Sequence, residues 1–199
     1  MNEHKGVFNQ QVREFFFGDL DSCFKVSKIK QGLPVDRYPF SGGLNFTAAL
    51  VIFCVIDMMA AYYKGITTDR RGRVIGASDD NVADFLIKYF GKYDSFFSDK
   101  EKSKLFYRVF RHGLVHQWSP KASGVAMNFS SNALLVKTTY GTEEIIILNA
   151  ATFYELTRKA LKDYEEDLDN GHFVDQFKKR HELIVKTDYD EMRLLRSKI

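Results

Sequence analysis

The sequence predicts a mainly α fold, a helical bundle with a small antiparallel β insertion, on three observations. Residues 46–63 are apolar except for Asp57, which is typical of a helix at the centre of a bundle. Residues 99–117 place apolar side chains at helical spacing along a broad face. Short runs rich in β-branched and aromatic residues begin after Pro120. A chain of 199 residues can bury a sizeable core, so we expect one domain over residues 1–199.

Five helices are expected before a helical tail, and local signals mark several of their ends. Gly32 and Pro34 stop the first helix, and Gly65 stops the second. Asn45 can cap the start of the second helix, and Ser78 can cap the start of the third. The predicted helices cover residues 7–30, 46–64, 78–89, 99–117 and 150–168.

The helix over residues 99–117, called the motif helix below, is the best delimited of the five. Ser98 and Glu101 have capping-box spacing, which would satisfy free backbone amides at its start. Pro120 prevents the helix from continuing. Beyond it we expect a small antiparallel sheet with a hairpin turn at residues 140–142. Its strands would cover residues 124–129, 133–140 and 144–148.

The remaining features fit a single intracellular domain. We expect a core over about residues 7–169 and a charged tail of one or two weaker amphipathic helices over residues 172–198. Residues 1–11 are polar and contain no apolar signal segment. Cys23 and Cys54 lack metal-type spacing, so we interpret them as small buried hydrophobic residues in a reducing compartment.

Residues 46–63 raise the question of a membrane. Their 18 residues could nearly span a bilayer by length. Asp57 near the middle of this stretch, and the lack of a second span, favour a buried core helix instead. We therefore expect a cytoplasmic protein with no membrane contact.

Basic residues are concentrated around the motif helix. The net charge of the chain is only +3, which by itself indicates no nucleic-acid partner. Between Lys100 and Lys121, six Lys or Arg residues stand against one acid, Glu101, so this stretch carries +5. A local basic patch can attract phosphates, but the pattern is also consistent with a solvated helix face. The polar loop over residues 65–77 is basic too, which is more typical of a soluble surface than of a site.

The motif helix carries histidines and arginines at the border of its apolar face. Arg108, Arg111 and His112 follow one another around one flank, and His116 lies beside the apolar stripe. In a first interpretation these side chains are only structural. In a second, His112 and His116 share a zinc ion, although no third ligand is indicated and Gly113 stands where a metalloprotease has glutamate.

A third interpretation is metal-free cleavage of RNA through its own 2′-hydroxyl group. This reaction needs a base, an acid and a positive charge against the transition state. Histidine titrates near neutrality and can fill the first two roles. Arginine stays charged and offers phosphate a bidentate fork.

Residues 111–116 read RHGLVH, which resembles the Arg-x4-6-His motif of HEPN domains. The aromatic-rich setting LFYRVFRHGLVHQWSPK also resembles bacterial HEPN proteins, and the resemblance covers roughly residues 40–168. It implies a HEPN-like bundle that dimerises and acts as a metal-independent endoribonuclease, often in toxin–antitoxin, phage-defence or CRISPR-associated systems. Carried over by position, Arg111 is the motif arginine and His116 its histidine. His112 stands where the family commonly has Asn, which leaves its role open.

The candidate site follows from these observations. We expect a homodimer with the site at its two-fold axis, because a second copy would supply a base and an acid on opposite sides of one phosphate. No metal and no cofactor are expected, and an antitoxin protein is a further candidate partner. The catalytic candidates are Arg111 and His116; the supporting candidates are His112, Arg108 and Asp57; the RNA-binding candidates are Lys104, Lys121, Arg70, Arg71 and Arg73.

Two alternatives stay open at this point. Asp57 must be paired or neutral on an apolar helix, so it either orients Arg111 or His116 or bonds a buried tyrosine. The whole chain is alternatively a non-catalytic HEPN-like module that binds RNA, a nucleotide or another protein.

Overall fold

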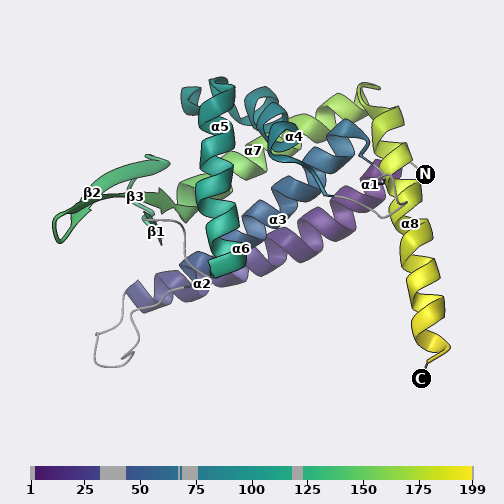
Figure 1. Ribbon diagram of the computed structural model, residues 1–199, viewed down its shortest axis with the longest axis horizontal. Coiled ribbons are helices and arrows are strands. Elements are labelled where there is room, and N and C mark those ends of the chain that lie inside the picture. Colours follow the sequence, from purple (N-terminus) through teal and green to yellow (C-terminus); the bar gives the residue numbers. More distant parts are fainter. Residues whose placement is uncertain (1–2, 32–43, 67, 69–75, 118–122, 199) are drawn as a thin grey trace.

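The computed structural model describes residues 3–31, 44–66, 68, 76–117 and 123–198 (Figure 1). At residues 3, 27–31, 116, 117 and 140 the description is limited to the backbone. The fold is mainly helical with one small sheet, so the predicted fold class is confirmed at this level.

The helices form where the sequence predicts them. A single long N-terminal helix comprises α1 (Glu3–Val7), a π-helical stretch (Phe8–Phe17) and α2 (Gly18–Gln31). The motif helix comprises α5 (Lys100–Tyr107), a π-helical turn (Arg108–His112) and α6 (Gly113–Gln117). The others are α3 (Asn45–Lys64), α4 (Asp79–Phe85) with its π-helical continuation (Leu86–Phe90), α7 (Ala150–Asp169) and α8 (Val174–Arg196). The charged tail is thus one helix.

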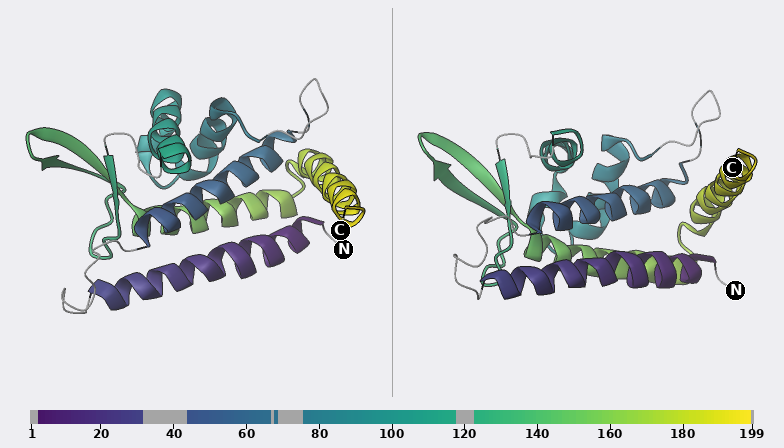
Figure 2. Two further views of the ribbon diagram at one scale, coloured as in Figure 1. Left: turned by 60° about the horizontal axis from the view of Figure 1, so that its bottom comes forward. Right: turned by 90° about the horizontal axis from the view of Figure 1, so that it is seen from below.

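The apolar helix α3 lies in the middle of the bundle. The N-terminal helix and α7 lie on one side of it, α4 and the motif helix on the other, and α8 crosses one end (Figure 2). Half of its residues are buried, which explains why it is apolar nearly all round. By length and composition alone α3 is able to cross a membrane, but 56% of its most apolar window is buried inside this protein. A buried core helix therefore accounts for the length and apolar composition of α3.

A triangle of aromatic rings fixes the motif helix against α3 and α7. Phe106 of α5 lies 5.6 Å from Phe53 of α3 and 5.3 Å from Phe153 of α7, measured between ring centroids. Phe53 and Phe153 are 5.0 Å apart. All three side chains are at most 3% exposed, and each such ring buries a large apolar area. Three helices therefore share one packed contact, and this contact sets the position of the motif helix.

The small sheet differs from the expected antiparallel one. Its strands are β1 (Ser123–Ala126), β2 (Leu135–Tyr140) and β3 (Glu143–Asn149), in the order β1-β3-β2. The predicted hairpin is present between β2 and β3, with Gly141 in the left-handed region at φ 62°. Because β3 occupies the centre, β1 lies on its other edge and pairs with it in parallel. The prediction of a wholly antiparallel insertion was therefore wrong.

Asn149 explains how the chain returns from β1 to the far edge of the sheet. Its side-chain amide donates to the carbonyl oxygens of Asn128 and Ser131, at 3.0 and 3.1 Å. Its oxygen accepts from the backbone of Ala151 at 3.2 Å and thereby caps α7. One buried amide thus holds the connecting loop and starts the next helix.

Two of the three predicted caps differ from expectation. Ser78 caps α4 as predicted, accepting from the backbone of Asn81 at 3.3 Å. The cap of the motif helix is Asp99, which accepts from the backbone of Lys102 at 3.0 Å, because Ser98 belongs to the preceding 3-10 turn. Asn45 does not cap α3; it is the first helical residue, and its amide donates to Val125 at 3.4 Å.

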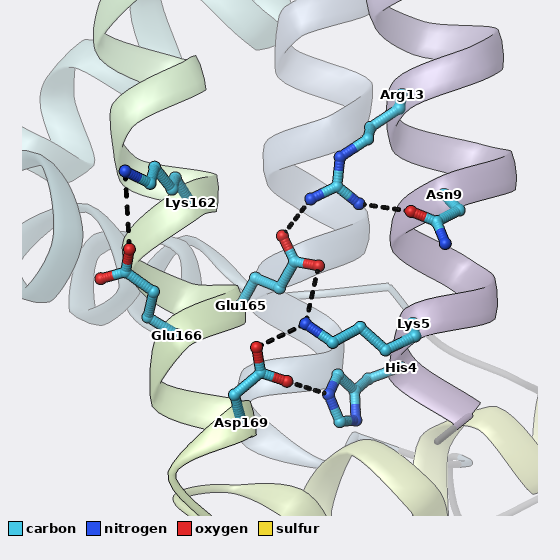
Figure 3. A network of polar contacts seen from close by, with 8 residues as sticks. All are labelled: His4, Lys5, Asn9, Arg13, Lys162, Glu165, Glu166 and Asp169. Atoms are coloured by element: carbon cyan, nitrogen blue, oxygen red, sulfur yellow. Dashed lines mark hydrogen bonds and ion pairs between the residues drawn. The ribbon is translucent and has the colours of Figure 1, made fainter. Parts of the chain in front are cut away.

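A network of ion pairs ties the N-terminal helix to the end of α7 (Figure 3). Asp169 contacts Lys5 and also lies 2.8 Å from Nε2 of the buried His4. The hydrogen bonds from Lys5 and then His4 hold the pKa of Asp169 below its ordinary value. Glu165, nearly buried one turn earlier, contacts both Lys5 and Arg13. This network positions the first helix along α7.

The two cysteines are less buried than the sequence suggested. Cys23 is half-buried, and Cys54 on α3 is exposed. Cys54 lies on the side of α3 that carries Asp57 and is near enough to Arg111 for the two charges to affect its thiol. The interpretation of Cys54 as a buried hydrophobic residue was wrong, because the described residues leave its side chain exposed.

The two candidate caps of the motif helix give a direct test of its start. We expect Asp99→Ala to lower the free energy of unfolding by about 1 kcal/mol, because an orphan backbone amide loses its acceptor. Ser98→Ala should stay within about 0.5 kcal/mol of the parent, because its side chain is exposed and caps nothing. Urea denaturation of both variants measures the difference, and a larger loss for Ser98→Ala would contradict the assignment of Asp99.

Candidate active site on the motif helix

The motif helix presents one buried side and one open side. Phe106, Phe110 and Leu114 are each at most 3% exposed and face the core. On the open side, Leu105 is 62% and Val115 is 42% exposed. The predicted apolar face is confirmed for Phe106, Phe110 and Leu114. The prediction was wrong for Leu105, which has helical spacing with this face in the sequence but is exposed in the structure.

Arg111 is held at the border of these two sides by Asp57 of α3. Its Nε donates to Oδ2 of Asp57 at 3.0 Å, and its Nη2 lies 2.9 Å from the same oxygen. The side chains of Arg111 and Asp57 are 27% and 19% exposed, so the pair is neither buried nor fully solvated. Within the described residues, Nη1 of Arg111 makes no hydrogen bond or ion pair.

Tyr107 completes the arrangement, and sequence reasoning missed it. Its hydroxyl donates to Oδ1 of Asp57 at 2.6 Å. Both proposed roles of Asp57 are therefore present at once, since it contacts Arg111 and also a buried tyrosine. The sequence does contain a signal for this contact. Tyr107 precedes Arg111 by four residues, so the two side chains share one face of the motif helix, and Asp57 is the only charged residue of residues 46–63 that could pair with them.

The protonation states of Asp57, Arg111 and Tyr107 are set by burial together with the contacts among the three side chains. Burial raises the pKa of Asp57, against the opposing effects of Tyr107 and Arg111. Burial lowers the pKa of Arg111, but the neighbouring carboxylate outweighs it, so the guanidinium stays charged. Burial and then Asp57 raise the pKa of Tyr107, so its hydroxyl remains a donor. These are the directions expected for one carboxylate shared between a cation and a phenol.

The other two polar residues of this flank face α4. Arg108 pairs with Oδ2 of Asp79, in the first turn of α4. Nε2 of His112 lies 3.5 Å from Oδ1 of the same carboxylate. The ring of His112 also packs edge-on against Tyr107, with centroids 5.5 Å apart. Asp79 thus contacts two side chains of the motif helix. The sequence alone did not indicate a role for Asp79.

Two lysines of the basic stretch are paired with α4 in the same way. Lys100 lies 2.7 Å from Asp84, and Lys104 lies 2.8 Å from Asp80 and 3.1 Å from Glu101. We call these contacts, with that of Arg108, the charge ladder. Because each cation of the charge ladder faces a carboxylate, part of the positive charge counted along the sequence is cancelled in space. Lys104, predicted to bind RNA, is paired with two carboxylates in this structure.

Several predicted site residues lie outside the described part of the chain. The backbone of His116 belongs to α6, but its side chain is not among those described. Lys121, Arg70, Arg71 and Arg73 also fall outside the described residues. The structure thus brings together Arg111, Asp57, His112 and Arg108.

Among the described residues, no group of three or more His, Cys, Asp or Glu side chains is placed to hold an ion. An open cleft of about 860 Å³ between α2 and α7 is lined by aromatic and charged residues, but by none of the motif helix. This cleft is therefore separate from the candidate site around Arg111.

A scan against models of protein families finds no match for this chain, and searches of curated proteins and of solved structures find none either. The chemistry must therefore be judged from the geometry around Arg111 and from the RHGLVH run.

The shared carboxylate predicts how this region responds to mutation. We expect Asp57→Ala to cost about 2 kcal/mol of stability, because it leaves a charged guanidinium and a buried hydroxyl without their acceptor. Asp57→Asn should cost less, since its amide oxygen still accepts one of the two bonds.

The control is Asp80→Ala, which removes an exposed partner of the charge ladder and should change stability far less. Denaturation in urea, which is uncharged and does not screen ion pairs, measures the free energy of unfolding of all three variants. Equal losses for Asp57→Ala and Asp80→Ala would show that the Asp57 contacts carry no special weight.

Proposed function

We propose that this protein is a metal-independent endoribonuclease of toxin or phage-defence type, acting as a homodimer with a composite active site. The observation that carries the proposal is the held guanidinium of Arg111. Asp57 occupies its Nε and Nη2 on one side, while Nη1 has no partner within the described residues. An oriented, charged and partly exposed fork of this kind suits a phosphate oxygen.

The roles follow from the order of residues on the helix. Arg111 stabilises the charge that develops on the phosphate. His116, one and a half turns later, acts as base or acid on the 2′-hydroxyl group or the leaving oxygen. His112 supports the site from the flank, where it contacts Asp79 and Tyr107. No ion is needed, because histidine and arginine supply proton transfer and charge.

The open side of the motif helix supports a second copy at the site. Leu105 and Val115 are large apolar residues exposed on the motif helix that carries Arg111, and Cys54 of α3 is also exposed. A two-fold axis through this surface would cover them and supply a second Arg111 and a second His116. One chain alone offers a single set of catalytic groups.

A second candidate function is supported by the charge ladder. Lys100, Lys104 and Arg108 already face carboxylates of α4, so these three cations are not free to bind an RNA backbone. A non-catalytic module that binds a protein partner, such as an antitoxin, would need no such charge. The two functions differ in whether Arg111 supports a reaction.

Cleavage of RNA by the purified protein is the test of catalysis. We expect Arg111→Lys, which keeps the charge but loses the fork, and His116→Ala to abolish cleavage. His112→Ala should reduce it less. Arg158→Ala, an exposed arginine on α7, is the matched control and should cleave normally. Melting temperatures measured in parallel separate lost chemistry from lost folding.

Activity should survive EDTA, and the products should end in 2′,3′-cyclic phosphate. Activity that EDTA removes and zinc restores would instead favour a metal bound by His112 and His116. Equal cleavage by all variants would refute the nuclease, and binding of a protein partner without any cleavage would favour the module.

The dimer is tested by mass. Light scattering at micromolar concentration should give about twice the 23.0 kDa of one chain. Leu105→Lys should produce a monomer, because it places a charge in the proposed contact on the open side of the motif helix. Tyr189→Lys, which changes a 74% exposed residue on the distant α8, should remain a dimer. A stable monomer with full activity, or dissociation only by Tyr189→Lys, would contradict a composite site.

A further inference from the structure

Tyr107 contacts three polar side chains of the candidate site, those of Asp57, Arg111 and His112. Its hydroxyl donates to Asp57 at 2.6 Å, and the guanidinium of Arg111 lies 5.8 Å from its ring centroid. Its ring also meets the ring of His112 edge-on at 5.5 Å. The side chain itself is 2% exposed, so these contacts are made from a fixed, buried position.

The hydroxyl group determines which oxygen of Asp57 is left for Arg111. A carboxylate on a helix can turn about its terminal torsion, which is broad and roughly two-fold. Because Tyr107 occupies Oδ1, the carboxylate plane is fixed and Oδ2 points at Nε and Nη2 of Arg111. The ring below the guanidinium limits its movement on the second side. Orientation of Arg111 therefore requires both the hydroxyl and the ring.

We propose that Tyr107 is the positioning residue of the site: through Asp57 it fixes the guanidinium of Arg111, whose Nε and Nη2 are held by the carboxylate while the side chain stays partly exposed. It does not touch the substrate. Its catalytic consequence rests on the proposed nuclease function, whereas its effect on the conformation of Arg111 does not. Removal of the hydroxyl group alone should loosen Arg111 without removing the ring.

The test compares Tyr107→Phe with Tyr89→Phe. Tyr89 is an equally buried tyrosine whose hydroxyl donates to a different carboxylate, Asp167, at 2.9 Å. Both variants lose one phenol–carboxylate hydrogen bond, so a purely structural role predicts equal effects. Only Tyr107→Phe alters the surroundings of Arg111.

The first readout is independent of activity. In arginine labelled with ¹⁵N, the Nε–H signal of Arg111 is identified by its loss in Arg111→Lys. We expect its hydrogen exchange to be about tenfold faster in Tyr107→Phe than in the parent or in Tyr89→Phe. Equal exchange in the two phenylalanine variants would overturn the proposal.

The second readout is RNA cleavage. We expect Tyr107→Phe to lower kcat about tenfold or more with little change in KM, because a poorly oriented arginine fails in the transition state. Tyr89→Phe should cleave like the parent. If the parent cleaves no RNA while the exchange of Arg111 still responds, the nuclease fails and the positioning role stands. If the parent cleaves and both variants match it, the positioning role fails alone.

Discussion

The ionised carboxyl group of Asp57 is the constraint on which the arrangement around the motif helix depends. A charge on an otherwise apolar central helix is costly unless it is paired, and α3 has no partner for it within its own sequence. The motif helix supplies both partners from consecutive turns, Tyr107 and Arg111. The ring triangle of Phe53, Phe106 and Phe153 fixes the helices at the distance where these bonds can form. Apolar packing sets the position of the helix, and Asp57 sets its rotation.

Periodicity was enough to predict the helices, the hairpin and the core position of α3, because each depends on local spacing and on burial of one face. What the sequence could not show depends on contacts between distant residues. The parallel pairing of β1 requires β3 to lie between β1 and β2. The choice of Asp99 over Ser98 as cap depends on a 3-10 turn that ends one residue before it. Exposure of Cys54 depends on which side of α3 the other helices leave open.

For the candidate site, the sequence pointed to Arg111 and Asp57 but left their contact open, and it did not point to Tyr107 or Asp79.

The charge ladder changes how the basic stretch should be understood. Counting along the chain gives a strongly positive segment, yet Asp79, Asp80 and Asp84 stand opposite three of its six cations. An RNA that binds this surface would therefore be held by few oriented contacts rather than by a broad positive field. This favours recognition centred on Arg111, and it makes the orientation of that one side chain more important than the number of basic residues near it. The same pairing of charges also fits a non-catalytic module that binds a protein partner.

The most direct measurement follows the side chain of Arg111 while RNA binds. In the protein labelled with ¹⁵N-arginine, titration with a 2′-O-methyl RNA, which lacks the attacking hydroxyl group and is not cleaved, reports contact at each arginine. If Arg111 is the phosphate-binding group held by Asp57, its Nε and Nη signals should shift as the RNA saturates, while those of Arg158 on α7 stay in place. RNA binding that shifts other arginine signals and leaves Arg111 unchanged would contradict an active site on the motif helix.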